Sequence, residues 1–374
     1  SSDVCSSDLF GGAGYHVSRC ALQHGDMSGA RVCHGRHKCD GGRAAADHDD
    51  LLALIVEIFG PMLRVNDLAA KVGFAPGWAL HSEIAYAVSD KPGGPYQHVN
   101  VALPARGLNP ATGKKFWDGD VTHNANAFCH DGKYYLYYMG NHGDGKSYPM
   151  HRNHQRIGVA IATHPAGPWT RMDKPVVDIT DDKKSFDSLC VTNPAACMRP
   201  DGGVVLIYKA VQYIEGKEMG GNVRYGAALA DKPEGPYIKT PGKIFEAEKP
   251  GKHWMVAEDP FIFHSRKYGN RYYAVTRDVV GTFTGSSGGI CLFQSDDGLN
   301  WKAAPNPKIL ASTFALEGGG KSNSNIERPA LLIEDGEPTY LFGATDGYKK
   351  GGKVKCMARG GGIEVRGKTR GRMV

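Results

Sequence analysis

The sequence predicts an all-β fold built from repeated four-stranded antiparallel units. Two patterns support this prediction. The first is a polar triplet that opens an apolar β-run, followed by a turn and a second run rich in tyrosine. Its clearest copy begins at residues 258–260, turns at 269–270 and continues over 271–275. Two β-runs joined by a short turn form a hairpin, so this copy predicts a hairpin with the carboxylates of Glu258 and Asp259 at its mouth.

The triplet recurs at a nearly constant spacing. Its third residue is Ala125, Pro194, Pro260 or Pro329, so the successive steps are 69, 66 and 69 residues. Each copy leads to an Asp-Gly or Gly-Asn turn and then to a further β-run. A constant step of this length indicates a repeat architecture with large units. The four copies are therefore equivalent parts of one repeat.

A corner rich in proline and glycine is the second pattern, and it runs in the same register. It occurs at residues 89–96, 163–169 and 230–237, with a variant at 295–301, each time after a short apolar strand. The repeat thus reads strand, turn, strand, loop, strand, corner, strand, which is a four-stranded antiparallel blade of a β-propeller. The first corner precedes the first triplet and needs a blade of its own. We therefore expect a five-bladed β-propeller whose first blade is incomplete.

Most of the chain is expected to form one large domain. The 374 residues include 41% hydrophobic residues and 50 glycines, which suits a large all-β domain with many turns. We predict the propeller over residues 61–354. Residues 1–60 and 355–374 lack both patterns, and residues 1–9 resemble a translated sequencing adapter. Both ends are therefore interpreted as non-native or frameshifted segments.

Two features of the N-terminal segment have alternative interpretations. Residues 33–39 contain cysteine and histidine, the ligand types of zinc, but their spacing matches no standard zinc finger, so no metal site is predicted there. Residues 44–59 have apolar positions compatible with an amphipathic helix, and an out-of-frame translation explains them as well. The inner strands of the first blade belong in this segment, which we interpret as damaged.

The charge of the chain is concentrated at its C-terminal end. Residues 355–374 carry six basic residues and one glutamate, so the rest of the chain is close to neutral although the formal net charge is +6. We therefore expect no nucleic-acid partner for the propeller, and a basic arm for an acidic partner is the alternative. No apolar run reaches the length of a transmembrane helix, so no membrane partner is expected.

Together these patterns resemble the five-bladed propeller glycoside hydrolases of families 43 and 117. The resemblance covers about residues 73–352 and rests on the triplets, on hairpins such as Asp-Gly-Lys-Tyr-Tyr-Leu-Tyr-Tyr at 131–138, and on the Gly-Pro-Trp or Gly-Pro-Tyr corners. It implies a glycosidase that cleaves plant or algal oligosaccharides or polysaccharides and requires no cofactor. A structural calcium ion on the propeller axis would fit the families, as would secretion or a periplasmic location.

The inner strands of a propeller converge on its axis, so residues about 70 positions apart should meet there. Seven triplet side chains are expected to line this centre: His123, Asn124, Asn193, Glu258, Asp259, Glu327 and Arg328. So many charged and polar groups in one place are costly to desolvate for the sake of the fold alone. They suit a sugar, because glycosidic cleavage needs one protonated carboxyl group and one carboxylate.

The resemblance assigns the first two catalytic roles. Glu258 matches the general acid of family 43, with Asp259-Pro260 in place of the Gly-Pro of the family, and crowding by Asp259 is expected to favour a protonated Glu258. Asn193 stands where the family has an aspartate, so Asp187 is predicted to assist the acid instead. The structural alternatives are an acidic loop in which Glu258 pairs with Arg277 or a lysine, and an Asp187 that caps a turn.

The catalytic base belongs to the first blade in family 43, in the part of the chain interpreted as damaged. Asp120 is the predicted substitute because its loop brings it to the mouth of the second blade, and Asp118 is an alternative. His253 is a second candidate acid by similarity to family 117, which uses a histidine in this role. Without a base the chain would be an inactive copy of an enzyme.

Four further residues are predicted to contact the substrate. Arg328 is suited to a bidentate grip on a carboxylate or on sugar hydroxyls. Trp117 and Trp254 are candidate stacking surfaces for a pyranose ring, and Arg156 lies in a polar cluster just before a strand. The structural alternative for Arg328 is an ion pair with Glu327. The two tryptophans could instead be buried at corners of the fold, and the cluster around Arg156 could be a solvated surface.

Three functions are compatible with this sequence. The first is a glycoside hydrolase acting on an oligosaccharide or polysaccharide. The second is a non-catalytic carbohydrate-binding propeller or inactive truncated enzyme, favoured by Asn193 and by the missing first-blade carboxylate. The third is a phosphorylase of the propeller type, which would need a basic phosphate pocket formed by Arg328, Arg156 and Lys209.

Overall fold

The computed structural model describes residues 17–18, 33–35, 52–59, 77–89, 92, 96–246, 256–314, 326–334 and 337–345. Within these ranges nearly all regular structure is β-strand, and the helices α2 (Gly77–His81) and α3 (Tyr148–Asn153) are short. This confirms the predicted all-β fold. No helix in the described ranges is long and apolar enough to cross a membrane.

The described strands form five sheets. The first contains β2 (Cys33–Gly35), β3 (Leu52–Phe59), β4 (Ser82–Ser89) and β5 (Gln97–Leu103). The second contains β6 (Val121–His130), β7 (Lys133–Asn141), β8 (Arg156–Ala162) and β9 (Thr170–Arg171). The third contains β10 (Cys190–Met198), β11 (Val204–Val211), β12 (Val223–Ala230) and β13 (Ile238–Lys239).

The fourth sheet contains β14 (Ala257–Ser265), β15 (Arg271–Asp278), β16 (Gly289–Ser295) and β17 (Lys302–Leu310). In these four sheets sequential strands pair antiparallel, which confirms the predicted four-stranded unit. The last sheet has three described strands, β1 (Val17–Ser18), β18 (Ile326–Glu334) and β19 (Glu337–Thr345). There β19 pairs antiparallel with β18 and parallel with β1.

The N-terminal strands correct two expectations. β3 pairs with β4 over its whole length, and β2 pairs with β3. Residues 52–59 therefore form a strand where a helix was considered, because the periodicity of a short apolar run does not distinguish the two. The first sheet also has four strands, so the prediction of an incomplete first sheet is wrong.

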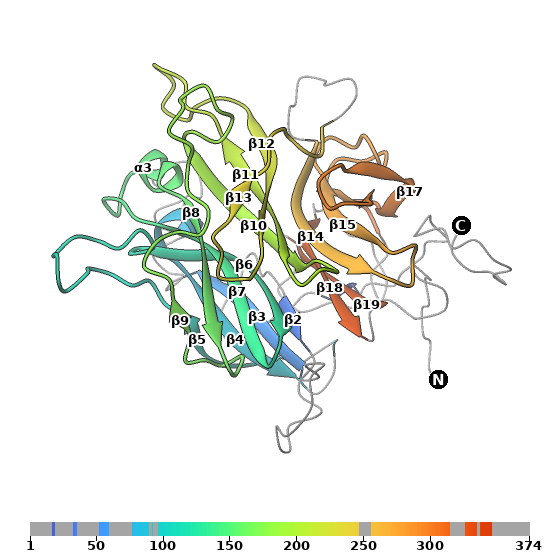
Figure 1. Cartoon of the computed structure of the whole chain (residues 1–374), viewed down its shortest axis with the longest axis horizontal. Helices are drawn as coiled ribbons and strands as arrows, with labels where there is room; N and C mark the ends of the chain where they lie inside the picture. Colours follow the sequence, from blue (N-terminus) through green and yellow to red (C-terminus); the bar gives the residue numbers. More distant parts are fainter. Residues whose placement is uncertain are drawn as a thin grey trace, which may run out of the picture.

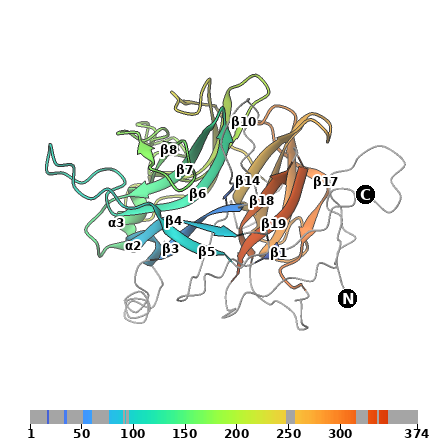
Figure 2. The same ribbon diagram turned by 90° about the horizontal axis from the view of Figure 1, so that it is seen from below.

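The first strands of successive sheets contact one another. β2 contacts β6, β6 contacts β10, β10 contacts β14, β14 contacts β18, and β18 contacts β2. Figure 1 shows β10, β14 and β18 near the middle of the molecule, with β9 and β17 at its periphery, and Figure 2 shows β10, β14 and β18 together from below. Because the four triplets lie on β6, β10, β14 and β18, this contact order brings them together.

Each triplet forms a β-bulge with a left-handed residue at its second position. The pairing register shifts at this point in all four hairpins. The second residues have positive φ angles: 54° for Asn124, 47° for Asn193, 52° for Asp259 and 52° for Arg328. Asn and Asp tolerate this conformation, whereas arginine rarely adopts it. Proline follows in three triplets because a bulge does not need its missing N–H.

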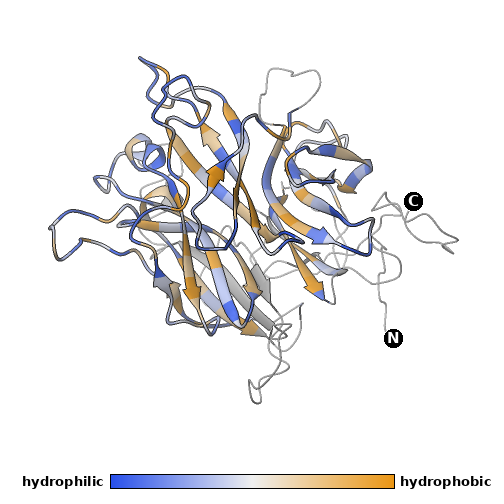
Figure 3. Cartoon of the chain, in the orientation of Figure 1, coloured by the Kyte–Doolittle hydropathy of each residue, from blue (hydrophilic) through white to orange (hydrophobic). Residues whose placement is uncertain are grey.

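Apolar side chains pack between adjacent sheets and hold the bulges in place. One cluster joins the second and third sheets and includes Tyr137 and Val191. Another joins the fourth and last sheets and includes Val275 and Leu331. Figure 3 shows hydrophobic colour concentrated on the strands and hydrophilic colour on the connecting loops. The triplets are therefore polar positions on otherwise apolar strands.

Candidate active site

Five polar side chains from the four triplets form a closed ring of contacts, here called the polar ring. Asn124 Nδ2 donates to Asn193 Oδ1 at 2.7 Å, and Asn193 Nδ2 donates to Asp259 Oδ1. Asp259 Oδ2 lies 4.0 Å from Arg328 Nε, and Arg328 Nη2 lies 2.5 Å from His123 Nε2. His123 precedes Asn124 on β6, which closes the ring. The structure thus brings together five of the seven side chains expected at the centre.

Four of the five side chains of the polar ring are buried, and Arg328 is partly exposed. The exposed fraction is 0% for His123, 2% for Asn124, and 5% for both Asn193 and Asp259. Buried polar groups lose hydration and need partners within the protein. The backbone N–H of Asp259 donates to the Tyr225 hydroxyl at 3.0 Å, which fixes the bulge. Asn124 Oδ1 is buried and accepts no hydrogen bond from the described residues, so one acceptor of the ring is unused.

Glu258 lies beside the polar ring and has a cation on each carboxyl oxygen. Lys209 Nζ is 2.8 Å from Oε1, and Arg277 Nη1 is 2.8 Å from Oε2. The three side chains are 15–18% exposed, so water screens these contacts only in part. Charge-assisted contacts of this length hold the carboxylate in place from both sides. The general-acid role of Glu258 stays a prediction.

Glu327 shares a guanidinium nitrogen with Glu258. Arg277 Nη1 lies 3.4 Å from Glu327 Oε1, and the Glu327 side chain is 44% exposed. Loss of solvent on the protein side raises the pKa of Glu327, and the charges of Asp259 and Glu258 also raise it, against the opposing charges of Arg277 and Arg328. Two carboxyl groups in different environments therefore flank one arginine.

Aromatic side chains of α2 and α3 lie against the polar ring. Trp78 stacks on His123 with centroids 5.4 Å apart and an interplanar angle of 25°, and Tyr148 meets Trp78 edge-on at 5.9 Å. Trp78 is half-buried. Burial raises the pKa of Tyr148, and the positive charges of Arg152 and Lys209 oppose this rise. An aromatic surface thus stands next to the ring, near Lys209.

Sequence reasoning named Arg277 or a lysine only as a structural partner of Glu258, and Lys209 only as part of a phosphate pocket, and it missed Trp78. The structure shows the cation-paired Glu258 of that alternative. The repeat could have located the two cations, because each lies on the second strand of its hairpin, opposite the first residue of a triplet. Lys209 pairs with Thr192, and Arg277 pairs with Glu258. Trp78 lies on α2, outside the repeat, and carries no comparable signal.

Asp187, predicted to assist the acid, lies outside the polar ring. It is 1% exposed, and its carboxylate contacts Lys239 Nζ at 2.6 Å, Ser185 Oγ at 2.5 Å and the Tyr208 hydroxyl at 3.1 Å. Burial acts to raise the pKa of Asp187, but hydrogen bonds from Lys239 and Ser185 outweigh it and lower the pKa. Lys239 is on β13, the last strand of its sheet. These are the contacts of a structural ion pair.

Asp120, the predicted base, is bound to its own loop and to the loop after β7. Its carboxylate accepts from Lys115 Nζ at 2.8 Å and from the Gly143 backbone N–H at 2.7 Å. The alternative, Asp118, is fully buried and bound by two arginines and a tyrosine. These contacts do not include a residue of the polar ring, and the base role stays a prediction.

Two predicted substrate contacts, one in the loop before β6 and one at the start of β8, have structural partners. Trp117 stacks on Tyr138 with centroids 5.4 Å apart, as a packed tryptophan does. Arg156 Nε lies 2.5 Å from Asp178 Oδ1, and its guanidinium donates to backbone carbonyls. Neither is brought to the polar ring. His253 and Trp254 lie outside the described residues.

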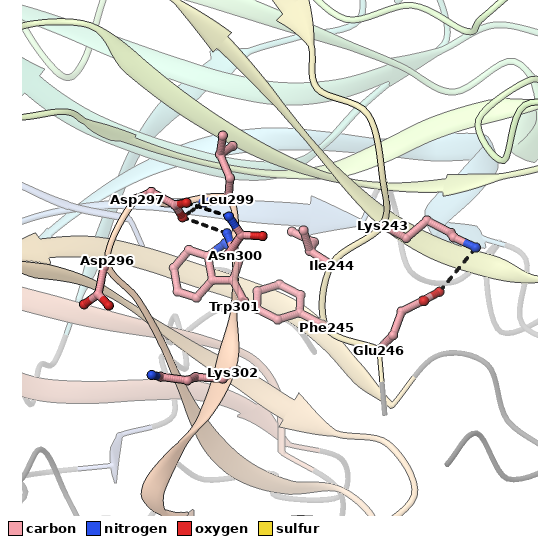
Figure 4. Close-up of a pocket in the computed structure, with 10 residues that line it drawn as sticks. All are labelled: Lys243, Ile244, Phe245, Glu246, Asp296, Asp297, Leu299, Asn300, Trp301 and Lys302. Atoms are coloured by element: carbon pink, nitrogen blue, oxygen red, sulfur yellow. Dashed lines mark hydrogen bonds and ion pairs between the residues drawn. The ribbon is translucent and has the colours of Figure 1, made fainter. Parts of the chain in front are cut away.

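A separate pocket lies at the edge of the fourth sheet. Its volume is about 420 Å³. Figure 4 shows Trp301 and Phe245 beside each other in this pocket, and their ring centroids are 5.4 Å apart. Asp297 accepts from the backbone N–H and the side chain of Asn300. No residue of the polar ring lines this pocket.

Metal ligands are not clustered in the described part of the chain. It contains no group of three or more His, Cys, Asp or Glu residues placed to hold a metal ion. The calcium ion that the family resemblance suggested for the axis therefore stays a prediction.

Comparison with known proteins gives structural likeness only. No family model and no curated protein matches the sequence. A family 117 glycoside hydrolase of the marine bacterium Zobellia galactanivorans has a TM-score of 0.53 and 18% identity, over 88% of this chain and 81% of that chain. A second structure, a glycoside hydrolase, has a TM-score of 0.59 and 15% identity, over 92% and 90% of the two chains. The chain therefore shares the all-β fold of glycoside hydrolases, including a member of family 117.

Proposed function

We propose that this chain is a glycoside hydrolase that cleaves an oligosaccharide or polysaccharide beside the polar ring. The observation that carries this proposal is the pair of glutamates, Glu258 and Glu327, on one guanidinium of Arg277. Glycosidic cleavage needs one carboxyl group that donates a proton and one that is ionised, and these two glutamates differ in their cation contacts and exposure. The shared fold with glycoside hydrolases supports the same reaction class.

The site belongs, in this proposal, to the centre of a five-bladed propeller. The five described sheets and the succession of contacts among β2, β6, β10, β14 and β18 support this architecture. In a propeller the first strands of the blades surround the axis. The polar ring would then be the floor of the central site, with Glu258 and Glu327 above it.

The surroundings of the ring suit a sugar. Sugars present apolar C–H faces and many hydroxyl groups, which call for an aromatic surface and hydrogen-bonding groups together. Trp78, Tyr148 and Lys209 supply these next to the polar ring. A plant or algal polysaccharide is the proposed source of the substrate.

The reaction class is tested by turnover of the unaltered protein. We expect release of nitrophenol from at least one member of a panel of nitrophenyl arabinosides, xylosides and galactosides, and release of sugars from the matching oligosaccharides. Liquid chromatography and absorbance measure the two products. Calorimetric binding of the same sugars without turnover would reject the enzyme and favour the binding protein.

That second function, a carbohydrate-binding protein, rests on one observation. Asn193, a neutral amide in the polar ring, occupies the place where family 43 carries an aspartate, and its amide bonds Asp259 rather than a catalytic group. The phosphorylase is less well supported. Lys209 is already paired with Glu258, and Arg156 is paired with Asp178.

Trp78→Ala is expected to raise KM for oligosaccharides about tenfold while changing kcat less. An aromatic stacking contact contributes about 0.5–1.5 kcal/mol beyond its area, and about 1.4 kcal/mol is a factor of ten in affinity. Steady-state kinetics on the best substrate measures the effect. Trp78→Phe is the control, since it keeps a ring against His123 and should recover most of the lost affinity. Equal KM values for the Ala variant and the parent would remove Trp78 from the binding site.

A further inference from the structure

The two glutamates of the site differ in the number of cations that hold them. Glu258 has a contact of 2.8 Å on each carboxyl oxygen, from Lys209 and from Arg277. Glu327 has a single longer contact of 3.4 Å, from Arg277 to Oε1. Its Oε2 has no hydrogen bond or ion pair with the part of the chain that the structure describes. Both oxygens of Glu258 therefore contact a cation, whereas only one oxygen of Glu327 does so among the described residues.

They also differ in accessibility. The Glu258 side chain is 15% exposed, whereas that of Glu327 is 44% exposed. A proton donor must reach the leaving oxygen of the substrate, within hydrogen-bond distance. Glu327 meets this requirement better, because its second oxygen is not engaged by a cation. Both carboxyl groups contact the same atom, Arg277 Nη1, so they are close enough for one substrate to reach both.

We propose that Glu327 is the proton donor of the glycosidase and that Glu258 is its ionised partner, an assignment that rests on the proposed function. Glu327 gives its proton to the glycosidic oxygen while the bond from that oxygen to the anomeric carbon breaks and its electron pair stays on the oxygen. A water oxygen forms the new bond to the anomeric carbon, and Glu258 takes the proton that this water loses. Exchange with solvent then returns a proton to Glu327 and removes one from Glu258.

The charges around Glu327 agree with this assignment. Loss of solvent is the largest cause that raises the pKa of Glu327. The carboxylates of Asp259 and Glu258 on β14 raise it further. Arg277 on β15 and Arg328 on β18 oppose the rise, but Arg328 also contacts Asp259 and His123, and Arg277 also contacts Glu258. The two arginines are thus shared with other partners. A carboxyl group that stays protonated toward neutral pH can act as an acid there.

The experiment compares Glu327→Gln with the parent on two leaving groups. Sugar leaving groups need a proton, whereas dinitrophenolate leaves without one. We expect kcat/KM of Glu327→Gln to fall at least about a hundredfold on an oligosaccharide and less than about tenfold on the dinitrophenyl glycoside. The alkaline fall of the parent pH profile should also disappear on the dinitrophenyl substrate, because a donor works only below its pKa. Glu334→Gln, at the far end of β18, is the matched control and should behave as the parent.

The outcomes separate this assignment from the reaction class. No turnover of any glycoside by the parent protein would overturn the glycosidase and this assignment with it. Turnover by the parent, with Glu327→Gln equally active on oligosaccharides or equally impaired on both leaving groups, would overturn only the donor role. Glu327→Asp guards against misfolding, since it should keep the alkaline fall of the profile and recover part of the activity on oligosaccharides.

Discussion

Glu258→Gln is expected to lose activity on both leaving groups, by about a hundredfold to ten-thousandfold in kcat. The carboxylate that activates water is needed whatever group leaves, so a good leaving group does not rescue this variant. Glutamine keeps the shape of the side chain but removes the charge that Lys209 and Arg277 contact at 2.8 Å. Steady-state kinetics on the oligosaccharide and the dinitrophenyl glycoside measures the loss.

A matched variant and a stability measurement make this result specific. Glu215 is exposed, in the loop after β11, so Glu215→Gln should retain full activity. Urea unfolding of Glu258→Gln should show that the variant is folded under the assay conditions, although two cations have lost a partner. Full activity of a folded Glu258→Gln would exclude the carboxylate from the reaction. Selective loss on oligosaccharides alone would make Glu258 the donor, as the family resemblance implied.

Asp118→Ala is expected to lower the free energy of unfolding by about 3–5 kcal/mol. The carboxylate is fully buried and accepts from Arg106 Nε at 2.5 Å, from Arg171 Nη1 at 3.3 Å and from the Tyr138 hydroxyl at 2.7 Å. Its removal leaves two arginines, 10–14% exposed, without this counter-charge. The loop that precedes β6 would lose its connection to β7 and β9.

Urea unfolding followed by tryptophan fluorescence measures this change. Asp173→Ala is the control, because Asp173 contacts Arg106 at 3.7 Å from a side chain that is 94% exposed. An exposed ion pair contributes about 0–1 kcal/mol, so the control should stay near the parent. Equal midpoints for the two variants would show that Asp118 is not the anchor of this loop. They would also reopen its candidacy as the base.

The polar ring was predictable from the sequence to a large extent. The triplets recur in register with turns and corners, and these local signals indicate hairpins whatever the rest of the chain does. Convergence then follows from the architecture, and it correctly grouped Asn124, Asn193, Asp259, Arg328 and His123. The second position of three triplets carries Asn or Asp for a conformational reason, since the bulge requires a positive φ, whereas Arg328 at the fourth is not favoured by it.

The charge partners of the site were less predictable. Lys209 and Arg277 lie on the second strand of their hairpins, so their place depends on the pairing register, which shifts at the bulge. Asp187 was chosen by its nearness to Asn193 in sequence, but a lysine of β13 binds it instead. Residues 52–59 lacked a triplet or corner, and only their pairing with β4 identifies a strand. Tertiary contacts and strand register decided each case, and local sequence does not record them.

The contact between β2 and β18 has a consequence for how the protein is made. It joins segments from opposite ends of the chain, so the mean sequence separation of contacting residues is high, and such folds form slowly. Hairpins can form one after another during synthesis, because each is local. Arg328 and Glu327 are on β18, however, and the last described sheet also needs β19. A nascent chain that stops before these strands would hold hairpins without a site, so activity should appear only after β18 and β19 have been synthesised.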